Sequence, residues 1–237
     1  MQKLLLASTS TLYNGNYLEY LLPELKKLYL GCSEILFIPF ARPGGISNID
    51  YTERVKKTFA AINIHANGIH EYEDPIKAIK EAGGYFTGGG NTFVLVKALH
   101  EKNLMSVLSK EIASGKPYFG SSAGSNIAGQ TMQTTNDMPI VYPPTFKTLG
   151  LIPFNLNPHY LDADLQSKHM GETRATRIKE FHAYNNLPVL GLREGSWLDV
   201  TGSQITLKGA LNARLFRKDQ EAIELQPGDI TDSFAEN

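Results

Sequence analysis

The chain has 237 residues, of which 42% are hydrophobic and 20% are charged, with 23 Lys and Arg against 24 Asp and Glu. This is ordinary globular composition, and the length suits one large domain or two small ones with a sizeable core. The net charge of −1 gives no basic excess for nucleic acid and no acidic tail for a basic partner. The single cysteine, Cys32, excludes an internal disulfide framework and a cysteine-based metal site.

The N-terminal segment lacks the pattern of a secretion signal. Its apolar run "LLLA" is shorter than the roughly 7–15 residues of a signal h-region. No stretch of the sequence approaches the roughly 18 apolar residues of a membrane span. We therefore expect a soluble cytoplasmic protein that contacts neither membrane nor nucleic acid, and the one free thiol agrees with this compartment.

The first half of the chain alternates short apolar runs with longer segments of helical periodicity. The clearest helix start is Asp74 before Pro75, because aspartate caps helix N-termini and proline favours the first turn. Strands are expected at 3–8, 34–40, 63–70, 83–90 and 117–120, and helices at 17–29, 51–62, 74–82 and 91–100. This βαβα order predicts a parallel sheet with helices on both faces.

After Gly129 the pattern loosens, and antiparallel strands are expected to be added to one edge of the sheet. We expect the tail, 229–237, to be frayed. No internal repeat or linker is visible, so residues 1–237 are expected to form one domain. Expected elements are a loop at 134–146, a helix at 172–186, a strand at 188–192, a hairpin at 197–209 that turns at 202–203, and strands at 213–218 and 221–225.

The segment from Gly120 to Gly124 fits the pattern G-x-S-x-G between a strand and a helix. In this context the central residue sits on a sharp turn, its neighbours two positions away must be small, and its side chain projects from the sheet edge. Ser122 is then a candidate nucleophile, and the Ala123 N–H is a candidate oxyanion donor. The alternative is a Gly/Ser-rich turn with a capping serine.

A serine nucleophile needs a base, and the base needs an orienting acid. His159 stands out because it follows a strand-like segment and Pro158 fixes its approach. Asp137 and Glu194 are the candidate acids, with solvated loop carboxylates as the alternative; the sequence order does not choose between them. The histidines of the chain are His65, His70, His100, His159, His169 and His182.

The order of these residues argues against a lipase or esterase of the α/β-hydrolase type. Those enzymes have the order Ser, Asp or Glu, His. Here no histidine follows Glu194 in the sequence, so that acid gives the order Ser, His, Glu. An order of Ser, Asp, His through Asp137 remains open.

A second glycine cluster, "TGGGNT" at 87–92, closes the strand before the elbow. A phosphate cradle is one interpretation, but the segment lacks the lysine of a P-loop and the spacing of G-x-G-x-x-G. We favour a loop of backbone N–H donors that supplies the second half of an oxyanion hole. A helix start capped by Asn91 or Thr92 is compatible with it.

Together these motifs resemble the peptidase E, or α-aspartyl dipeptidase, family. The matching pieces span from about Leu4 to Phe216, in the family's order: "IPF", "GGGNTF", "SAGSN", "TTNDMPI", "NPHY", "GETRATRI" and "EGSW". The resemblance implies the class I glutamine-amidotransferase-like fold, with serine in place of the amidotransferase cysteine. That fold is α/β, a mainly parallel sheet flanked by helices with antiparallel strands added near the C-terminus.

The resemblance also implies cleavage of dipeptides with an N-terminal aspartate, without metal or cofactor. It makes Ser122 the nucleophile and His159 the base, and it favours Glu194 over Asp137 as the acid. The acid that does not orient the base is then a candidate for the substrate amine.

Two further parts of the site follow from the resemblance. The oxyanion is expected between the Ala123 N–H and a backbone N–H near Gly89 or Gly90. Arg174 in "GETR" is expected to bind the aspartate side chain, because a guanidinium can grip a carboxylate with two hydrogen bonds. The alternative for Arg174 is an exposed helix arginine that pairs loosely with Glu172.

Some positions depart from the family pattern. Ser121 stands where relatives often carry a large aromatic residue, and the loop 41–50 and the segment after His159 differ, so both are candidates to line the substrate mouth. Rival functions are a hydrolase of isoaspartyl, β-linked or γ-glutamyl amides, a binding module without turnover, and an esterase. Exposed strand edges leave a homodimer open.

Overall fold

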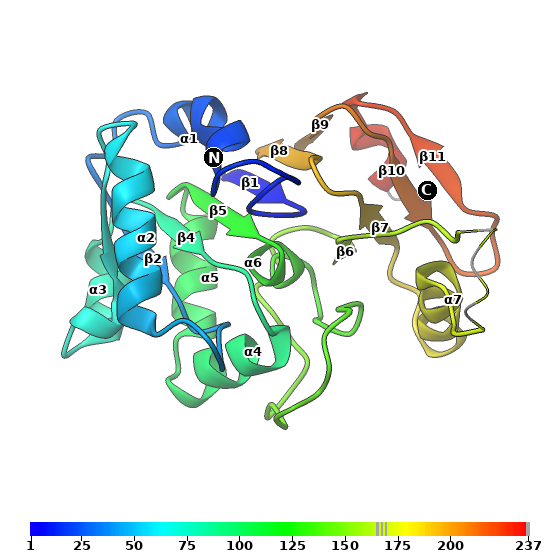
Figure 1. Cartoon of the computed structure of the whole chain (residues 1–237), viewed down its shortest axis with the longest axis horizontal. Coiled ribbons are helices and arrows are strands. Elements are labelled where there is room, and N and C mark those ends of the chain that lie inside the picture. The colour runs from blue at the N-terminus through cyan, green and yellow to red at the C-terminus, as the bar shows by residue number, and fades with distance from the viewer. Residues whose placement is uncertain (165, 167, 169, 236–237) are drawn as a thin grey trace.

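The computed structural model describes residues 1–164, 166, 168 and 170–235. In this part of the chain a sheet of 8 strands and a sheet of 4 strands lie beside each other (Figure 1). The order of the large sheet is β12-β9-β8-β1-β5-β4-β2-β3. Its strands are β1 (Lys3–Ala7), β2 (Glu34–Ile38), β3 (His65–Gly68), β4 (Tyr85–Thr87), β5 (Tyr118–Ser121), β8 (Trp197–Thr201), β9 (Gln204–Lys208) and β12 (Gly228–Asp229).

The strands β1, β5, β4, β2 and β3 run parallel and are covered on both faces. Successive side chains of a strand point to opposite faces, so Leu4 and Leu6 join one core cluster while Leu5 and Ala7 join another. The second cluster packs under α1 (Leu22–Leu28) and α2 (Asn48–Ala60). The first packs under α3 (Pro75–Glu81), α4 (Thr92–Glu101) and α5 (Met105–Ala113).

Antiparallel strands extend the sheet beyond β1. β8 pairs with β1, β9 pairs with β8 through a turn at 202–203, and β12 pairs with β9. The predicted α/β class, with a mainly parallel sheet and added antiparallel strands, is confirmed. The expectation that the strands at 213–218 and 221–225 join this same edge is wrong, because they pair elsewhere.

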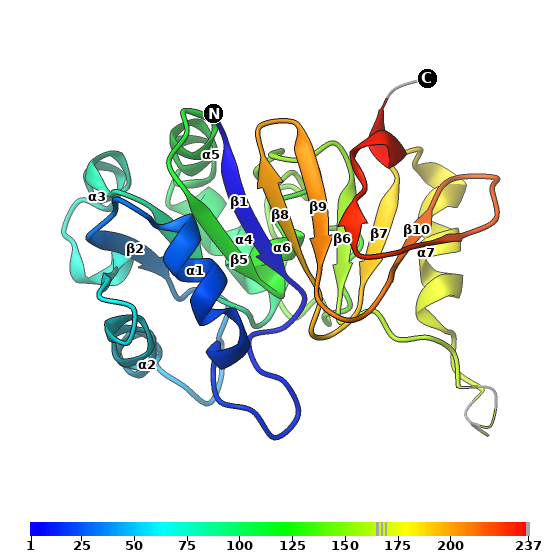
Figure 2. The ribbon, with the colours of Figure 1, turned by 90° about the horizontal axis from the view of Figure 1, so that it is seen from above.

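Those strands belong to the second sheet, whose order is β11-β10-β7-β6. In Figures 1 and 2 this sheet and α7 (Arg174–Tyr184) lie on the opposite side of the molecule from α2 and α3. One core cluster contains side chains from both sheets, among them Leu4, Leu190 and Leu215. The strands are β6 (Asn155–Pro158), β7 (Val189–Leu192), β10 (Ala213–Phe216) and β11 (Ile223–Leu225).

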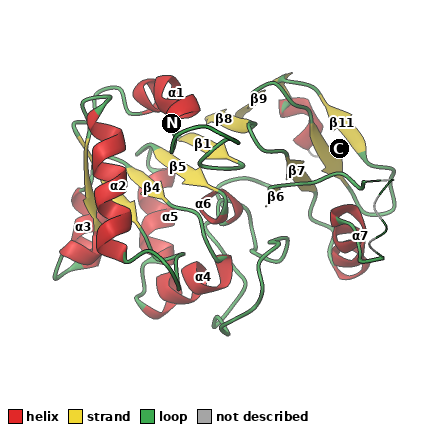
Figure 3. Cartoon of the chain, viewed as in Figure 1, coloured by secondary structure: helices red, strands yellow, loops and turns green. Residues whose placement is uncertain are grey.

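Two expectations about local structure need correction. The helix at 17–29 is broken, since Leu18 has a φ of 58° and a 3₁₀ turn precedes α1. The tail is not frayed through residue 235: Ile230 is buried, and the ring of Phe234 stacks on that of Phe154 with centroids 3.9 Å apart. Figure 3 shows a long loop between α6 (Ala123–Asn126) and β6, as expected for the Pro-rich segment. Within the described residues, no helix combines the length and hydrophobicity needed to cross a membrane.

Candidate active site

The turn at Ser122 is a strained connection between β5 and α6. Ser122 has a φ of 53° and a ψ of −109°, a backbone conformation that a residue with a side chain rarely adopts. A Cβ on Gly120 would lie 2.5 Å from the Gly124 carbonyl oxygen, and a Cβ on Gly124 would lie 2.1 Å from the Thr87 carbonyl oxygen. Only glycine fits at these two positions. The strand, the sharp turn and the helix expected around Ser122 are all present.

His159 lies directly after β6, and its imidazole reaches the serine. Its Nε2 is 3.0 Å from Ser122 Oγ, and its Nδ1 is 2.6 Å from Glu194 Oε1. The residue has a φ of 53°, so its backbone needs support. Ser8, which is fully buried, provides it: Ser8 Oγ accepts from the His159 N–H at 2.8 Å and donates to the Leu192 carbonyl oxygen at 2.7 Å.

Glu194 follows β7, and its neighbour Arg193 fixes this end of the strand. Arg193 donates to both oxygens of Asp162 and both oxygens of Glu224, at 2.8 to 2.9 Å. The hydrogen bonds from Arg193 hold the pKa of the Asp162 carboxyl below its usual value. The network therefore ties the segment after His159, the end of β7 and β11 together around Glu194.

None of the described hydrogen bonds joins Asp137 to His159. Its Oδ2 accepts from the Thr92 N–H at 2.7 Å and from the Thr92 hydroxyl at 2.6 Å, and the Thr135 hydroxyl lies 2.9 Å away. No hydrogen bond of the described residues engages Asp137 Oδ1. The acid beside the imidazole is thus Glu194, while Asp137 sits at the start of α4, where Asn91 caps the helix by accepting from the Val94 N–H.

The glycine cluster approaches Ser122 closely. A Cβ on Gly89 would lie 3.0 Å from Ser122 Cβ and 3.5 Å from Ser122 Oγ. Gly90 has a φ of +145°, and a Cβ there would lie 2.1 Å from the Ala41 carbonyl oxygen. Gly90 therefore needs glycine, and a side chain at Gly89 would crowd Ser122, so this backbone lies next to the serine.

A cavity of about 380 Å³ opens beside Ser122. It collects side chains of both charge signs around the serine and the imidazole. Its lining residues are Arg42, Gly90, Thr92, Ser122, Ala123, Asn126, Thr135, Asn136, Asp137, Pro158, His159 and Arg174.

Arg174, the first residue of α7, is half-buried in the wall of this cavity. Burial and the neighbouring Arg177 hold the pKa of its guanidinium below the usual value, whereas Asp137 raises that pKa. The ion pair expected as the alternative for Arg174 is made by Arg177 instead, whose Nε is 3.9 Å from Glu172.

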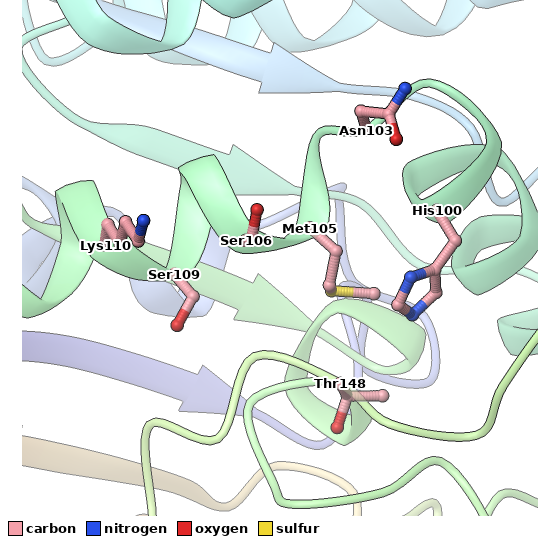
Figure 4. A pocket seen from close by; sticks show the side chains of 7 residues that line it. All are labelled: His100, Asn103, Met105, Ser106, Ser109, Lys110 and Thr148. Carbon is pink, nitrogen blue, oxygen red and sulfur yellow. The ribbon is translucent and has the colours of Figure 1, made fainter.

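A second cavity, of about 410 Å³, lies between α4, α5 and the loop near residue 148 (Figure 4). Its histidine, His100, has Nε2 2.9 Å from the Lys147 carbonyl oxygen. None of the described hydrogen bonds joins His100 to Ser106 or Ser109, and Ser109 Oγ donates to the Leu149 carbonyl oxygen. Among the described contacts, this cavity therefore has no serine–histidine hydrogen bond like the one between Ser122 and His159.

The described part of the chain shows no metal site beside Ser122. His169 lies outside the described residues. Among the residues that the structure does describe, no group of three or more His, Cys, Asp or Glu side chains is arranged to hold a metal ion.

Two residues at the site were not singled out from the sequence: Ser8, and Arg42 within the loop 41–50 that was expected to line the substrate mouth. Each lies just after a strand of the parallel sheet, at the carboxyl edge where the site forms. That position was the available signal, because ligands and catalytic groups of open α/β sheets gather at this edge. Neither residue belongs to a motif, so only the fold brings Arg42 into the cavity and Ser8 under His159.

Comparison with known proteins agrees with this architecture. The model of peptidase family S51 matches residues 4–208. A peptidase E from Streptomyces coelicolor is 46% identical over 226 residues, covering 95% of this chain and 91% of that protein. A Drosophila melanogaster protein named "Probable alpha-aspartyl dipeptidase" is 43% identical over 234 residues, covering 97% and 96%.

The fold is also similar to a solved structure, a peptidase from an acI-B1 Actinobacterium. That structure superposes with a TM-score of 0.67 at 16% identity, covering 96% of this chain and 95% of the other. At this identity the likeness concerns the fold alone. The match of the family model and the sequence relatives establish the affiliation: the chain belongs to peptidase family S51.

Proposed function

We propose that this protein is a serine-type dipeptidase that hydrolyses dipeptides with an N-terminal aspartate. The observation that carries the proposal is the chain of contacts from Ser122 through His159 to Glu194, beside a cavity with charges of both signs. Membership of peptidase family S51 supports the reaction, and the name of the Drosophila relative supports the substrate.

Acylation follows from the three contacting side chains. Ser122 Oγ attacks the scissile carbonyl carbon while His159 Nε2 takes the hydroxyl proton, and Glu194 stabilises the imidazolium through Nδ1–H. Backbone N–H groups of Ala123 and of Gly89 or Gly90 stabilise the oxyanion. The C–N bond then breaks, and His159 protonates the leaving amine, which leaves an aspartyl ester on Ser122.

Deacylation reuses the same groups in reverse. A water molecule donates its proton to His159 Nε2 and attacks the ester carbonyl carbon. Collapse of the second tetrahedral intermediate breaks the bond to Ser122 Oγ, which recovers its proton from His159. The net reaction consumes one water molecule and releases free aspartate, and each step uses only the side chains and backbone groups named above.

Recognition of aspartate rests on Arg174 and Asp137. The guanidinium of Arg174 binds the substrate's side-chain carboxylate with two hydrogen bonds. Asp137 binds the substrate ammonium through Oδ1, while the Thr92 and Thr135 groups hold Oδ2. A substrate without the side-chain carboxylate leaves the half-buried Arg174 unpaired, and such a loss can cost on the order of 10⁴ in kcat/KM.

Compartment and assembly are part of the proposal. A cytoplasmic location suits a chain with a single cysteine that acts on small peptides. A homodimer is proposed from the exposed strand edges, and the molar mass in solution tests it.

The experiment is a matched panel of dipeptides: Asp-Leu, Asn-Leu, Glu-Leu, Ala-Leu and isoaspartyl-Leu. We expect the wild type to cleave Asp-Leu far faster than the others. The Arg174→Ala variant should lose most of the preference for Asp-Leu over Asn-Leu. Arg177→Ala is the matched control, since Arg177 lies on the same helix, is exposed and does not line the cavity.

Two results would contradict the proposal. Faster cleavage of isoaspartyl-Leu than of Asp-Leu would assign the protein to the neighbouring amide hydrolases with the same site. Equal rates on Asp-Leu and Asn-Leu in the wild type would remove the aspartate specificity.

A further inference from the structure

The described lining of the cavity has one more charged side chain than recognition of an N-terminal aspartate requires. Among the described lining residues, those with a fixed charge are Arg42, Asp137 and Arg174. Arg174 and Asp137 account for the side-chain carboxylate and the ammonium of the first residue of the substrate. Arg42 has no role in the steps described above.

Arg42 is held in place, but most of its N–H donors have no partner among the described hydrogen bonds. It follows β2 in the loop that leads to α2, and its Nε donates to the Gly89 carbonyl oxygen at 3.0 Å. Its guanidinium carbon lies 5.4 Å from the ring centroid of buried Tyr51, a distance typical of cation–π contact. The guanidinium has five N–H donors, and the described hydrogen bonds use only the one at Nε.

The position of Arg42 suits a group one residue beyond the scissile bond. The carbonyl that holds Arg42 belongs to Gly89, whose Cα approaches Ser122 so closely that a Cβ would lie 3.5 Å from Oγ. Consecutive residues are separated by about 3.8 Å along the chain. In a dipeptide bound for attack by Ser122, the carboxylate of the leaving residue lies about one such step from the scissile carbonyl.

The charges of the cavity mirror those of the whole substrate. A dipeptide of aspartate and a neutral residue carries two carboxylates and one ammonium at neutral pH. The described lining offers two guanidinium groups and one carboxylate. Resting on the proposed function, we infer that Arg42 binds the α-carboxylate of the leaving residue and so restricts the enzyme to substrates that end directly after that residue.

This inference explains a preference for dipeptides over longer chains. In a tripeptide the same position is a neutral peptide group, which leaves the free N–H donors of Arg42 without a charged partner. Loss of a charge-assisted hydrogen bond of this kind lowers kcat/KM by about 10- to 100-fold.

The test compares Asp-Leu with aspartyl-leucinamide, which differs only by the missing terminal charge. The wild type should prefer Asp-Leu by about 10-fold or more, and Arg42→Ala should reduce that ratio to near unity. Arg42→Gln keeps a donor for the Gly89 carbonyl but no charge, so it should lose the ratio as well. Arg54→Ala is the matched control, since Arg54 also stacks on a tyrosine, Tyr17, but does not line the cavity.

Each possible outcome either supports or overturns the inference. An unchanged ratio in Arg42→Ala, or an equal fall in activity on both substrates, would limit Arg42 to holding the Gly89 peptide and overturn the inference. A wild type that prefers Asp-Leu over Asn-Leu but not over aspartyl-leucinamide would overturn it while leaving the proposed function intact. A wild type that cleaves neither aspartyl compound would contradict the proposed function and remove this inference with it.

Discussion

The two acids of the site meet different partners, so we expect different roles for them. Glu194 lies 2.6 Å from His159 Nδ1, whereas Asp137 accepts from Thr92 and Thr135. Glu194→Gln should lower kcat by about 10²- to 10⁴-fold with little change in KM, because the imidazolium loses its charged partner.

Asp137→Asn should raise KM for Asp-Leu by about 10- to 100-fold, because the substrate ammonium loses its carboxylate. Steady-state kinetics at neutral pH measure both effects, and the reverse pattern would exchange the two roles.

The candidate residues could be selected from the sequence more readily than their contacts. Ser122 and His159 could be selected because a glycine-flanked elbow and a proline-led strand end are local patterns. The choice between Asp137 and Glu194 needed a distance, which the order of residues along the chain does not contain. Arg42 was not singled out within the loop 41–50 for a similar reason, since only the packing of this loop against Gly89 brings it into the cavity.

At the scale of elements, the elbow depends on how closely α6 packs on β4. Gly124→Ala would place a Cβ 2.1 Å from the Thr87 carbonyl oxygen, so helix and strand must separate. We expect a loss of roughly 1–3 kcal/mol in the free energy of unfolding, as for other overpacked sites, together with a lower kcat because Ser122 shifts. Gly44→Ala is the control, since its added Cβ would meet no atom within 4 Å. Denaturant titration of both variants measures the difference, and equal stabilities would contradict the packing argument.

The elements that the sequence predicted well are those set by local patterns. The apolar runs of the parallel strands and the Asp74 cap of α3 needed no knowledge of the fold. Helix α5 was not among the expected elements, which contained no helix between residues 100 and 117; Asn103, with a φ of 57°, separates α5 from α4. The pairing of β10 with β7 was also missed, because the choice of a partner strand depends on tertiary packing rather than on either sequence.

At the scale of the whole molecule, we propose that the chain folds as one unit, because one apolar cluster includes residues of both sheets. Salt bridges around Arg193 add a pH-dependent contribution. The pKa of Asp162 is lower in the folded protein, so its contribution is complete above the unfolded-state value of about 3.9 and is lost as the pH falls through the folded value.

Asp162→Asn tests this contribution directly. The variant should melt at a lower temperature than the wild type at pH 7, and the difference should shrink as the pH is lowered towards about 3. Glu221→Gln is the control, since Glu221 is exposed and makes no ion pair among the described contacts. A difference that stays constant across this pH range would show that the charge of Asp162 does not act through Arg193.

The central claim is that Ser122 is the nucleophile of an aspartyl dipeptidase, and covalent labelling tests it most directly. A fluorophosphonate would be added to the wild type and to the variants Ser122→Ala and Ser121→Ala. Mass spectrometry would identify the labelled peptide, and the remaining hydrolysis of Asp-Leu would be measured. Ser121 is the matched neighbour, because its side chain is fully buried. We expect the label to fall on Ser122 in the wild type and in Ser121→Ala, and activity to fall in step with labelling. Ser122→Ala should neither be labelled nor cleave Asp-Leu. Cleavage of Asp-Leu by Ser122→Ala, or labelling of another residue in step with the loss of activity, would contradict it.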